Sequence, residues 1–257
     1  MSRLWKRYGE LNIGGRLLRT PPMAIDYEEN FSIYSKPIAA IKIYNPAKAT
    51  VEAAKQKGCL VAFAAGYDND NGTRFTGEVY KHSYKTGLTS ELTIECSDKS
   101  SLWTNSLVNR SFRGPVKASE VIQDILSGVG ISCRLQLGED YNYERGITFA
   151  DTLSSCLRRC AEDTKSRLLF KGGGITFLAD QEGQLLGYRL TPKTGLLSVE
   201  ETATGYKCKT LFLHDLTAGS IAQLSLSGGD ATIKITKGTA KFSVYGDAGI
   251  EFEAVRL

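Results

Sequence analysis

The segment CLVAFAAGY (Cys59–Tyr67), followed by DNDNG (Asp68–Gly72), decides the fold class. The nine residues Cys59–Tyr67 are almost entirely apolar, which is typical of a buried strand. Asn71-Gly72 is the dipeptide preferred in type I′ hairpin turns. The strand pattern returns over Arg74–Tyr84 and again over Glu91–Cys96. The segment and its continuation therefore predict a three-stranded antiparallel meander of the kind found in small barrels and sandwiches.

Two further strands and a helix precede this meander. Apolar residues alternate with polar ones through Ile25–Tyr34 and Ile38–Tyr44, which predicts two strands. Asn45-Pro46 is a turn signal. Ala47–Lys57 then predicts a short helix that ends at Gly58, because glycine is favoured just after a helix C-terminus. The first third of the chain is therefore expected to be a β module.

The middle of the chain predicts two amphipathic helices. Apolar residues recur at helical spacing over Val116–Val129, and Ser119 or a nearby residue can cap the start of this helix. The same spacing returns over Phe149–Asp163, with Thr148 or Asp151 placed to cap it. We therefore expect a helical or mixed segment between two β-rich regions.

The last third of the chain returns to strand patterns. Strands are expected at Arg167–Phe170, Ile175–Leu178, Leu185–Leu190, Tyr206–Leu213, Ile221–Leu226, Ala231–Thr236, Ala240–Tyr245 and Ile250–Val255. The order strand, turn, strand, turn, strand that begins at Gly58 recurs from Gly219, after the two helices. Either the chain contains a duplicated barrel module, or the two meanders are alike because all meanders share this order.

Together these patterns predict an α+β fold with two small antiparallel β-barrel-like modules and a helical or mixed insert between them. We assign residues 1–100 to an N-terminal β module, residues 101–165 to the helical insert and residues 166–257 to a C-terminal β module. A chain of 257 residues is long enough to bury its own core.

The charge balance argues against some classes of function. Lys and Arg number 32 against 28 Asp and Glu, and no basic run occurs, so the composition does not support nucleic-acid binding. The longest uncharged run, Gly58–Tyr67, is about half of the ~20 residues that a membrane helix needs, so no membrane insertion is expected. The first 22 residues lack the apolar core of a signal peptide. We therefore expect a reducing compartment and free, buried thiols at Cys59, Cys96, Cys133, Cys156, Cys160 and Cys208.

The two histidines offer little for catalysis. His82 lies within a predicted strand and is expected at the surface. Asp215 could orient the ring of His214, but a catalytic triad also needs a nucleophile on an exposed turn, and the sequence has no Gly-x-Ser-x-Gly motif. We expect neither histidine to be catalytic.

Cys156 and Cys160 lie four residues apart on a predicted helix. Redox pairs have two intervening residues, and zinc sites with cysteine ligands usually contain a Cys-x-x-Cys pair, which the sequence lacks. Both cysteines continue the apolar stripe of Leu153 and Leu157. Core packing is therefore the favoured interpretation.

Two turn-like segments resemble ligand-binding loops only in part. Asp68, Asp70 and Gly72 are spaced somewhat like a calcium loop, but the glycine comes one position early and Val79 stands where the closing glutamate is needed. Gly172–Gly174 is followed by neither Lys-Ser/Thr nor a helix, as a phosphate-binding loop requires. Hairpin turns are favoured at both places.

Acidic residues form two local clusters, Asp26, Glu28 and Glu29 in one and Glu200 and Glu201 in the other. A catalytic acid pair needs two carboxyl groups a few ångströms apart, one of them in an apolar site. We favour the interpretation that both clusters consist of solvated acidic residues in loops. The sequence therefore predicts a protein that is not an enzyme and that has no catalytic, cofactor-binding or metal-binding residues.

The order of several segments resembles one family, the baseplate hub proteins of contractile-tailed phages and phage-like particles (the tail protein D group). Ile41–Pro46 resembles the family's strand that ends in an Ile-Tyr-Asn turn. Gly58–Val79 resembles its next hairpin, which carries Ala-Gly-Tyr and Phe-x-Gly elements. Ile94–Asp98 and the helix at Ala118–Gly130 resemble the passage into its helical insert. Thr194–Leu197 resembles the segment before its final β module.

This resemblance implies a structural tail-tip hub. In the family, three copies form a ring that joins the tail tube to the central spike and lets DNA pass, and two barrel modules per chain match a sixfold tube to a threefold spike. The implied partners are two further copies of the chain, the spike protein, tube or tube-initiator proteins, and wedge and tape-measure proteins. The implied locations are the virion baseplate and, during assembly, the host cytoplasm. The alternative is a tail-tip enzyme that degrades the cell wall.

Overall fold

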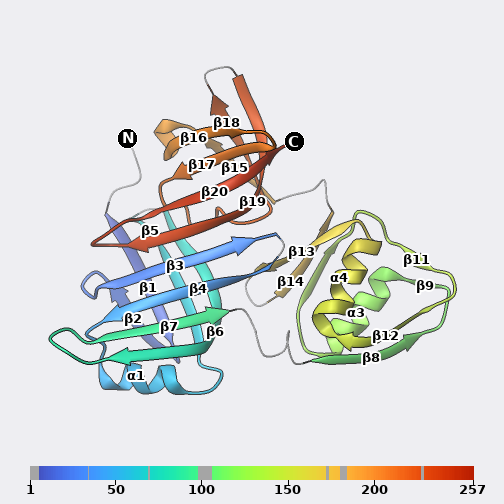
Figure 1. Cartoon of the computed structure of the whole chain (residues 1–257), viewed down its shortest axis with the longest axis horizontal. Helices are drawn as coiled ribbons and strands as arrows, with labels where there is room; N and C mark the ends of the chain where they lie inside the picture. Colours follow the sequence, from blue (N-terminus) through green and yellow to red (C-terminus); the bar gives the residue numbers. More distant parts are fainter. Residues whose placement is uncertain are drawn as a thin grey trace. The chain divides into compact units, whose positions relative to one another are not determined.

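The computed structural model describes residues 6–33, 35–68, 70–97, 106–171, 174–179, 184–226 and 229–257 (Figure 1). The chain divides into two compact units. Unit 1 combines Met1–Ser97 with Gln184–Leu257, and unit 2 is Asp98–Gly183. Most described elements are antiparallel strands, accompanied by a few helices, so the predicted α+β class is confirmed.

Within the described residues, unit 1 contains a 13-stranded sheet. Its N-terminal part consists of β1 (Arg7–Ile13), β2 (Arg16–Thr20), β3 (Ile25–Ser32), β4 (Ser35–Tyr44), α1 (Lys48–Lys55), β5 (Leu60–Tyr67), β6 (Asp70–Lys85) and β7 (Glu91–Ser97). Its C-terminal part consists of β15 (Gln184–Leu190), the 3-10 helix η1 (Pro192–Thr194), β16 (Leu196–Thr202), β17 (Gly205–Thr210), β18 (Ser220–Leu226), β19 (Gly229–Ser243) and β20 (Gly249–Arg256). The strand order is β16-β17-β20-β19-β3-β4-β7-β6-β5-β1-β2, and β18 pairs with β15 and β19.

The predicted three-stranded meander is confirmed as β5, β6 and β7, which pair antiparallel in that order. The turn between β5 and β6 lies earlier than predicted, because Asn71 and Gly72 pair with β5 inside the ladder. The ladder ends at the pair Tyr67 and Asp70, and Asn69 lies outside the described residues. Gly72 is needed in the strand because a Cβ there would collide with the ring of His214.

The last long strand also differs from the prediction. Ala231–Thr236 and Ala240–Tyr245 were expected to be separate strands, but the structure has one continuous 15-residue strand, β19. A bulge between Ile235 and Lys237 bends it. Before the bulge β19 pairs with β18, and after it β19 pairs with β3, so both halves have partners and no turn is needed.

Two groups of five strands in unit 1 share one topology. Set 1 has the order β3-β4-β7-β6-β5, set 2 has the order β16-β17-β20-β19-β18, and every neighbouring pair in each set is antiparallel. Each set contains a meander with a long central strand, which is β6 with 16 residues in set 1 and β19 with 15 in set 2. Among the described strands, no ladder closes either set into a barrel.

One hydrophobic core serves both sets. Buried side chains from set 1 and set 2 belong to a single cluster. Within it, Tyr27 stacks on Phe63 with ring centroids 4.3 Å apart, and Phe242 packs edge-on against Phe63 and Phe212. These rings connect β3 and β5 of set 1 to β19 of set 2, so the two sets fold as one unit.

Unit 2 has its own core. Its described elements are β8 (Leu107–Phe112), β9 (Val116–Lys117), α3 (Ala118–Gly128), β10 (Cys133–Gln136), β11 (Asn142–Tyr143), β12 (Ile147–Thr152), α4 (Leu153–Asp163), β13 (Ser166–Lys171) and β14 (Gly174–Ala179). Strand β8 pairs with β12, β9 pairs with β11, and β14 lies between β10 and β13. The apolar faces of α3 and α4 pack together with these strands in a second cluster.

Both predicted helices form, but each begins later than expected. Helix α3 begins at Ala118 rather than Val116, and α4 begins at Leu153 rather than Phe149. Phe149 instead lies in β12, where it pairs with β8. Helical spacing and strand alternation coincide over this short stretch, so the pattern alone did not separate them.

The helix caps also differ from the prediction. In α4 the hydroxyl of Thr152, not Thr148 or Asp151, accepts a hydrogen bond from the backbone N–H of Ser155. In α3 the side chain of Asp140 accepts the backbone N–H of Ser119 at 2.9 Å, and it also accepts the hydroxyl of that serine. The cap of α3 therefore comes from a segment distant in sequence, which local pattern cannot reveal.

Strands β13 and β14 belong to unit 2. The sequence analysis places residues 166–179 in the C-terminal β module, whereas these strands pair with each other and with β10. Residues 172 and 173 of the predicted Gly172–Gly174 turn lie outside the described residues. Local alternation identifies a strand but not its partner, which is why the sequence boundary falls before these two strands.

Candidate functional site

The most distinctive surface of unit 1 is one exposed face of the large sheet, which we call the charged face. It spans eight neighbouring strands, β16-β17-β20-β19-β3-β4-β7-β6. The strand registers put the following side chains on this face: Glu200, Lys207, Lys209, Glu251, Glu253, Lys237, Lys241, Asp26, Glu28, Lys42, Glu91, Glu95, Lys81 and Lys85. The opposite face of the same strands carries the core residues.

The sign of the charge alternates from strand to strand across the charged face. The charged side chains on this face are acidic on β16, β20, β3 and β7 and basic on β17, β19 and β4, and also on β6 after its bulge, where Lys81 and Lys85 lie; Glu78, before the bulge, is the exception. Neighbouring strands are therefore linked by ion pairs, which are Lys209–Glu251 (2.8 Å), Lys237–Glu253 (3.0 Å), Lys241–Glu28 (3.6 Å), Lys42–Glu91 (3.5 Å) and Lys81–Glu95 (2.6 Å). All of these side chains are at least partly exposed, so each pair contributes little to stability.

Two of the ion pairs shift the pKa values of Lys209, Glu251 and Glu95 toward the charged forms. A hydrogen bond to Glu251 raises the pKa of Lys209, and the same contact lowers the pKa of Glu251. A hydrogen bond from Lys81 is the main cause that lowers the pKa of Glu95. The face therefore carries interspersed charges of both signs at neutral pH, and a polyanion sliding over it would meet no continuous basic surface.

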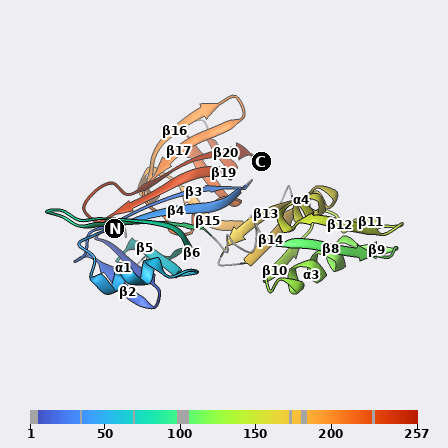
Figure 2. The ribbon, with the colours of Figure 1, turned by 60° about the horizontal axis from the view of Figure 1, so that its bottom comes forward.

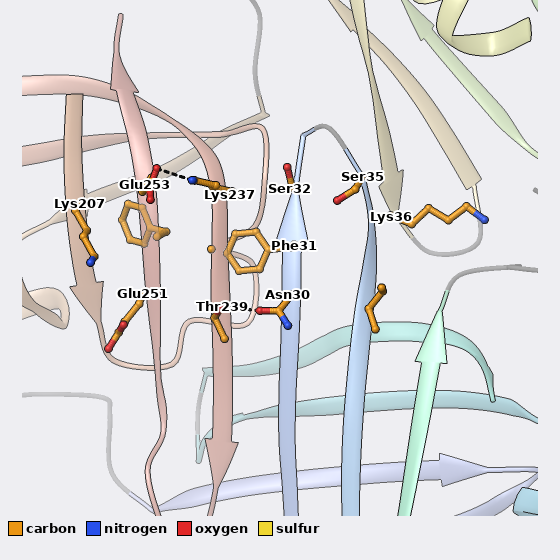
Figure 3. Close-up of a pocket in the computed structure, with 13 residues that line it drawn as sticks. Asn30, Phe31, Ser32, Ser35, Lys36, Lys207, Lys237, Thr239, Glu251 and Glu253 are labelled. Carbon is orange, nitrogen blue, oxygen red and sulfur yellow. Dashed lines mark hydrogen bonds and ion pairs between the residues drawn. The ribbon is translucent and has the colours of Figure 1, made fainter. Parts of the chain in front are cut away.

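Two shallow grooves open on the charged face. One, of about 470 Å³, lies over β4, β3, β19 and β20. Figure 3 shows Lys237 paired with Glu253 at one end of it and Thr239 beside Asn30 below. The other, of about 320 Å³, is lined by Asp26, Glu28, Lys42 and Lys241, among others. Both are open, and each has one ion pair among its lining residues, Lys237–Glu253 in the first and Lys241–Glu28 in the second.

A third groove, of about 680 Å³, lies on the core side of set 2 beside β16. Its lining includes the apolar residues Leu196, Val199 and Tyr206 and the charged residues Glu201 and Arg256. Strand β16 is the last strand in the order, so this groove borders an edge of the sheet.

The histidines do not form a catalytic constellation. His82 lies on the exposed part of β6, as expected. His214 is near Asp215, with 3.2 Å between Nε2 and Oδ2, and near Asp70, with 3.6 Å between Nδ1 and Oδ1. Its ring packs over Gly72, and neither histidine lines any of the three grooves.

The two cysteines that lie four residues apart on α4 are in the core of unit 2. Cys156 and Cys160 are buried beside Leu153 and Leu157, in agreement with the core-packing interpretation. Burial raises the pKa of the Cys160 thiol to about 12. All six cysteines are free in the structure, and five of them are buried while Cys133 is partly exposed.

The interpretation of the acidic clusters as loop acids is wrong. Glu28 and Glu29 lie in strand β3, and Glu200 and Glu201 lie in strand β16. Glu29 is buried and forms an ion pair with the buried Arg74. No sequence signal predicted this pair, because the two residues are 45 positions apart.

The described part of the chain holds no group of three or more metal-ligating side chains. Within the same residues, no helix is long and apolar enough to span a membrane.

Comparison with known proteins identifies the fold. No family model and no curated protein matches the sequence. A 43 kDa tail protein of prophage MuSo2 from Shewanella oneidensis matches with a TM-score of 0.72 at 9% identity, over 97% of this chain and 98% of that chain. The c3393 protein of E. coli, described as a type VI secretion component similar to the T4 phage tail proteins gp27 and gp5, matches with a TM-score of 0.71 at 12% identity, over 96% and 76%.

A tail protein from Neisseria meningitidis MC58 matches with a TM-score of 0.70 at 9% identity, over 98% of this chain and 97% of that chain. At such low identity the likeness concerns the fold. This chain therefore has, over nearly its whole length, the fold found in phage tail proteins and in a type VI secretion component.

Proposed function

We propose that the protein is a structural tail-tip hub whose three copies form a ring between the tail tube and the central spike. The observation that carries the proposal is the repeated topology of set 1 and set 2 within one unit. Two similar modules per chain present six similar modules when three copies close a ring. Such a ring can match a sixfold tube on one side and a threefold spike on the other.

The two barrel-like modules of this proposal are set 1 and set 2. Their resemblance extends beyond strand order. In each set the long central strand has a bulge, and a lysine beside the bulge makes an ion pair with a glutamate of the next strand of the meander. These pairs are Lys81–Glu95 in set 1 and Lys237–Glu253 in set 2. A shared bulge and ion pair support descent of the two sets from one module.

The charged face is the surface that suits a channel for DNA. A strongly basic lining would hold the phosphate backbone, because phosphate contacts dominate affinity for DNA. Here every lysine strand has an acidic strand beside it. The proposal therefore assigns this face to the lumen of the ring, with DNA as a transient and weakly bound passenger.

The proposed partners are two further copies of the chain, a spike protein below the ring and tube or tube-initiator proteins above it, with wedge and tape-measure proteins as neighbours in the virion baseplate. The role is non-enzymatic. The fold likeness to tail proteins supports this assignment.

The test is the mass of the purified protein in solution, alone and with its spike protein, together with electron microscopy of the assembled particle. We expect three copies around the axis. Six copies around the axis, or no association with a spike, would contradict the hub. A fall in the turbidity of purified cell wall on addition of the protein would favour the enzyme alternative.

A further inference from the structure

Several strand edges in the described part of unit 1 have no partner strand, and two of them, on β6 and β16, bound the charged face. Strand β6 pairs with β5 only up to Glu78, so the side of residues 80–85 that faces away from β7 is open. Strand β16 ends the strand order, so its side that faces away from β17 is also open. The β6–β7 hairpin projects from unit 1 in both views (Figures 1 and 2). Open edges are sites for the addition of another strand.

The internal repeat shows which strand pairs with the edge of β19 that is equivalent to the open edge of β6. The bulges align Lys81 of β6 with Lys237 of β19, and the register then aligns Lys85 with Lys241. In β19 the stretch Lys237–Ser243 is not open, because β3 pairs with it antiparallel. Strand β3 is the first strand of set 1, and its counterpart in set 2 is β16.

The register of the two first strands aligns their acidic residues. Strand β3 pairs with β4, and β16 pairs with β17. When β4 is aligned with β17 in the repeat, Glu28 and Glu29 of β3 fall at the positions of Glu200 and Glu201 of β16. Within the chain, Lys241 lies opposite Glu28, and their charged groups are 3.6 Å apart. The counterparts Lys85 and Glu200 have no ion-pair partner within the described residues. The repeat therefore leaves one basic and one acidic edge unmatched.

The charge pattern supports the same match. Acidic and basic strands alternate across the charged face from β16, which is acidic, to the part of β6 after its bulge, which is basic. When two copies lie side by side, the alternation of charge sign continues from one copy into the next only if the basic β6 edge of one meets the acidic β16 edge of the other. Pairing β6 with β6 or β16 with β16 would place like charges side by side, which destabilises a sheet.

We propose that the β6 edge of one copy pairs antiparallel with the β16 edge of a second copy, in the register that β19 and β3 have within a chain. Ser83 then lies opposite Thr202 of the second copy, and Lys85 lies opposite Glu200 of the second copy. This inference rests on the proposed ring and names the interface that closes it. A contact between two different edges of the same chain is head-to-tail, so repeating it generates a ring when the rotation closes.

The pairing also covers exposed apolar surface. Tyr84 is 40% exposed although it lies on the same face of its hairpin as the buried Leu92. In the proposed register its side chain lies opposite Glu201 of the second copy, at the groove that Leu196 and Val199 line beside β16. The neighbouring copy thereby fills the groove beside β16 in set 2. In set 1, β19 covers the corresponding side of β3.

Cysteine cross-linking tests the register. The internal counterpart of the Ser83 and Thr202 pair is Thr239 and Asn30, whose side-chain oxygens are 2.8 Å apart. The variant Ser83→Cys/Thr202→Cys should therefore form disulfides between copies on oxidation, giving a covalent trimer on a non-reducing gel. The variant Thr239→Cys/Asn30→Cys should form the same bond within one chain and serves as the positive control. The variant Ser83→Cys/Ser198→Cys moves one cysteine by about 13 Å along the strand and should not cross-link.

Charge reversal in the cross-linking variant tests the complementarity. Lys85→Glu or Glu200→Lys alone should lower the cross-linking yield about two- to five-fold, as expected for an exposed pair. The two changes together should restore the yield. Arg16→Glu, on β2, which pairs with β1 and with neither β6 nor β16, should leave the yield unchanged.

The outcomes separate this interface from the proposed function. A trimer in solution whose Ser83/Thr202 cysteines cross-link no more than the off-register pair would overturn the interface and leave the hub proposal standing. A protein that stays monomeric at high concentration and with its spike, and that does not cross-link, would overturn both.

Discussion

Arg74 Nε lies 2.5 Å from Oε2 of Glu29, and the exposed fractions of the two side chains are 0% and 3%. The same guanidinium donates from Nη1 to the backbone carbonyls of His214 and Leu216, and Tyr27 donates its hydroxyl to Glu29. One buried cluster thus ties β6 and β3 to the segment between β17 and β18. Because that segment belongs to set 2, the cluster holds the two sets together.

We expect that removing one partner of this pair is costly. Arg74→Leu leaves the buried Glu29 carboxylate with the Tyr27 hydroxyl but without a cation, which should lower the free energy of unfolding by about 3–5 kcal/mol. Arg74→Leu combined with Glu29→Leu should recover much of that loss, because no buried charge remains. Denaturant unfolding measures both. Equal losses for the single and double variants would show that the charge pairing is not the source of the effect.

The close approach of His214 to Gly72 gives a second prediction. Gly72→Ala places a methyl group where the His214 ring lies, and it should destabilise the protein by about 1–3 kcal/mol through overpacking. His214→Ala in the same chain should remove the clash, so the cost of Gly72→Ala should largely vanish in that background. A double-mutant cycle of thermal unfolding tests the coupling. Strictly additive effects would mean that the ring does not occupy this space.

Helix α3 gives a test of the helical register in unit 2. Ile125 is 3% exposed and Gln123 lies on the opposite, exposed face. Ile125→Ala should cost roughly 2–5 kcal/mol, whereas Gln123→Ala should change stability by no more than about 0.5 kcal/mol. Equal and small losses for both would contradict the burial of this face.

The cap of α3 should depend on Asp140 rather than on Ser119. Asp140→Ala removes both acceptors at the helix start and should cost about 0.5–2 kcal/mol. Ser119→Ala keeps the backbone N–H that Asp140 accepts, so its cost should be smaller. If denaturant unfolding ranks the two variants the other way, the cap is local, as the sequence suggested.

The thiols should be slow to react in the folded protein. Burial raises the pKa of Cys96 and Cys160 to about 12 and that of Cys133 and Cys208 to about 11. Folded thiols therefore stay protonated at pH values where unfolded thiols ionise, near about 8.5. Their contribution to stability is complete below that pH and is lost as the pH rises toward the folded values.

Two measurements check this. Thiol titration after denaturation should count all six cysteines, and the same reagent at neutral pH should react slowly before denaturation. A denatured count of two or zero in material kept reduced would contradict free thiols. Stability that does not fall between about pH 9 and pH 11 would contradict the shifted pKa values.

The sequence by itself determined the elements whose signal is local. The apolar run Cys59–Tyr67 and the alternation after it specified the first meander, and the apolar stripe around Ile125 specified α3, because burial of one face imposes a period on nearby residues. The α+β class and the repeated order of strands followed from the same local patterns. The resemblance of the ordered motifs led to the tail-protein fold that comparison of structures supports.

Only the tertiary structure decided which distant strands meet. Asn30 and Thr239 face each other across the β3–β19 ladder although 209 positions separate them, and no local pattern encodes that register. The burial of Glu29 against Arg74, the cap from Asp140 and the assignment of β13 and β14 to unit 2 have the same origin. Periodicity reports which face of a segment is buried, whereas strand partners and buried charge pairs depend on which other segment covers that face.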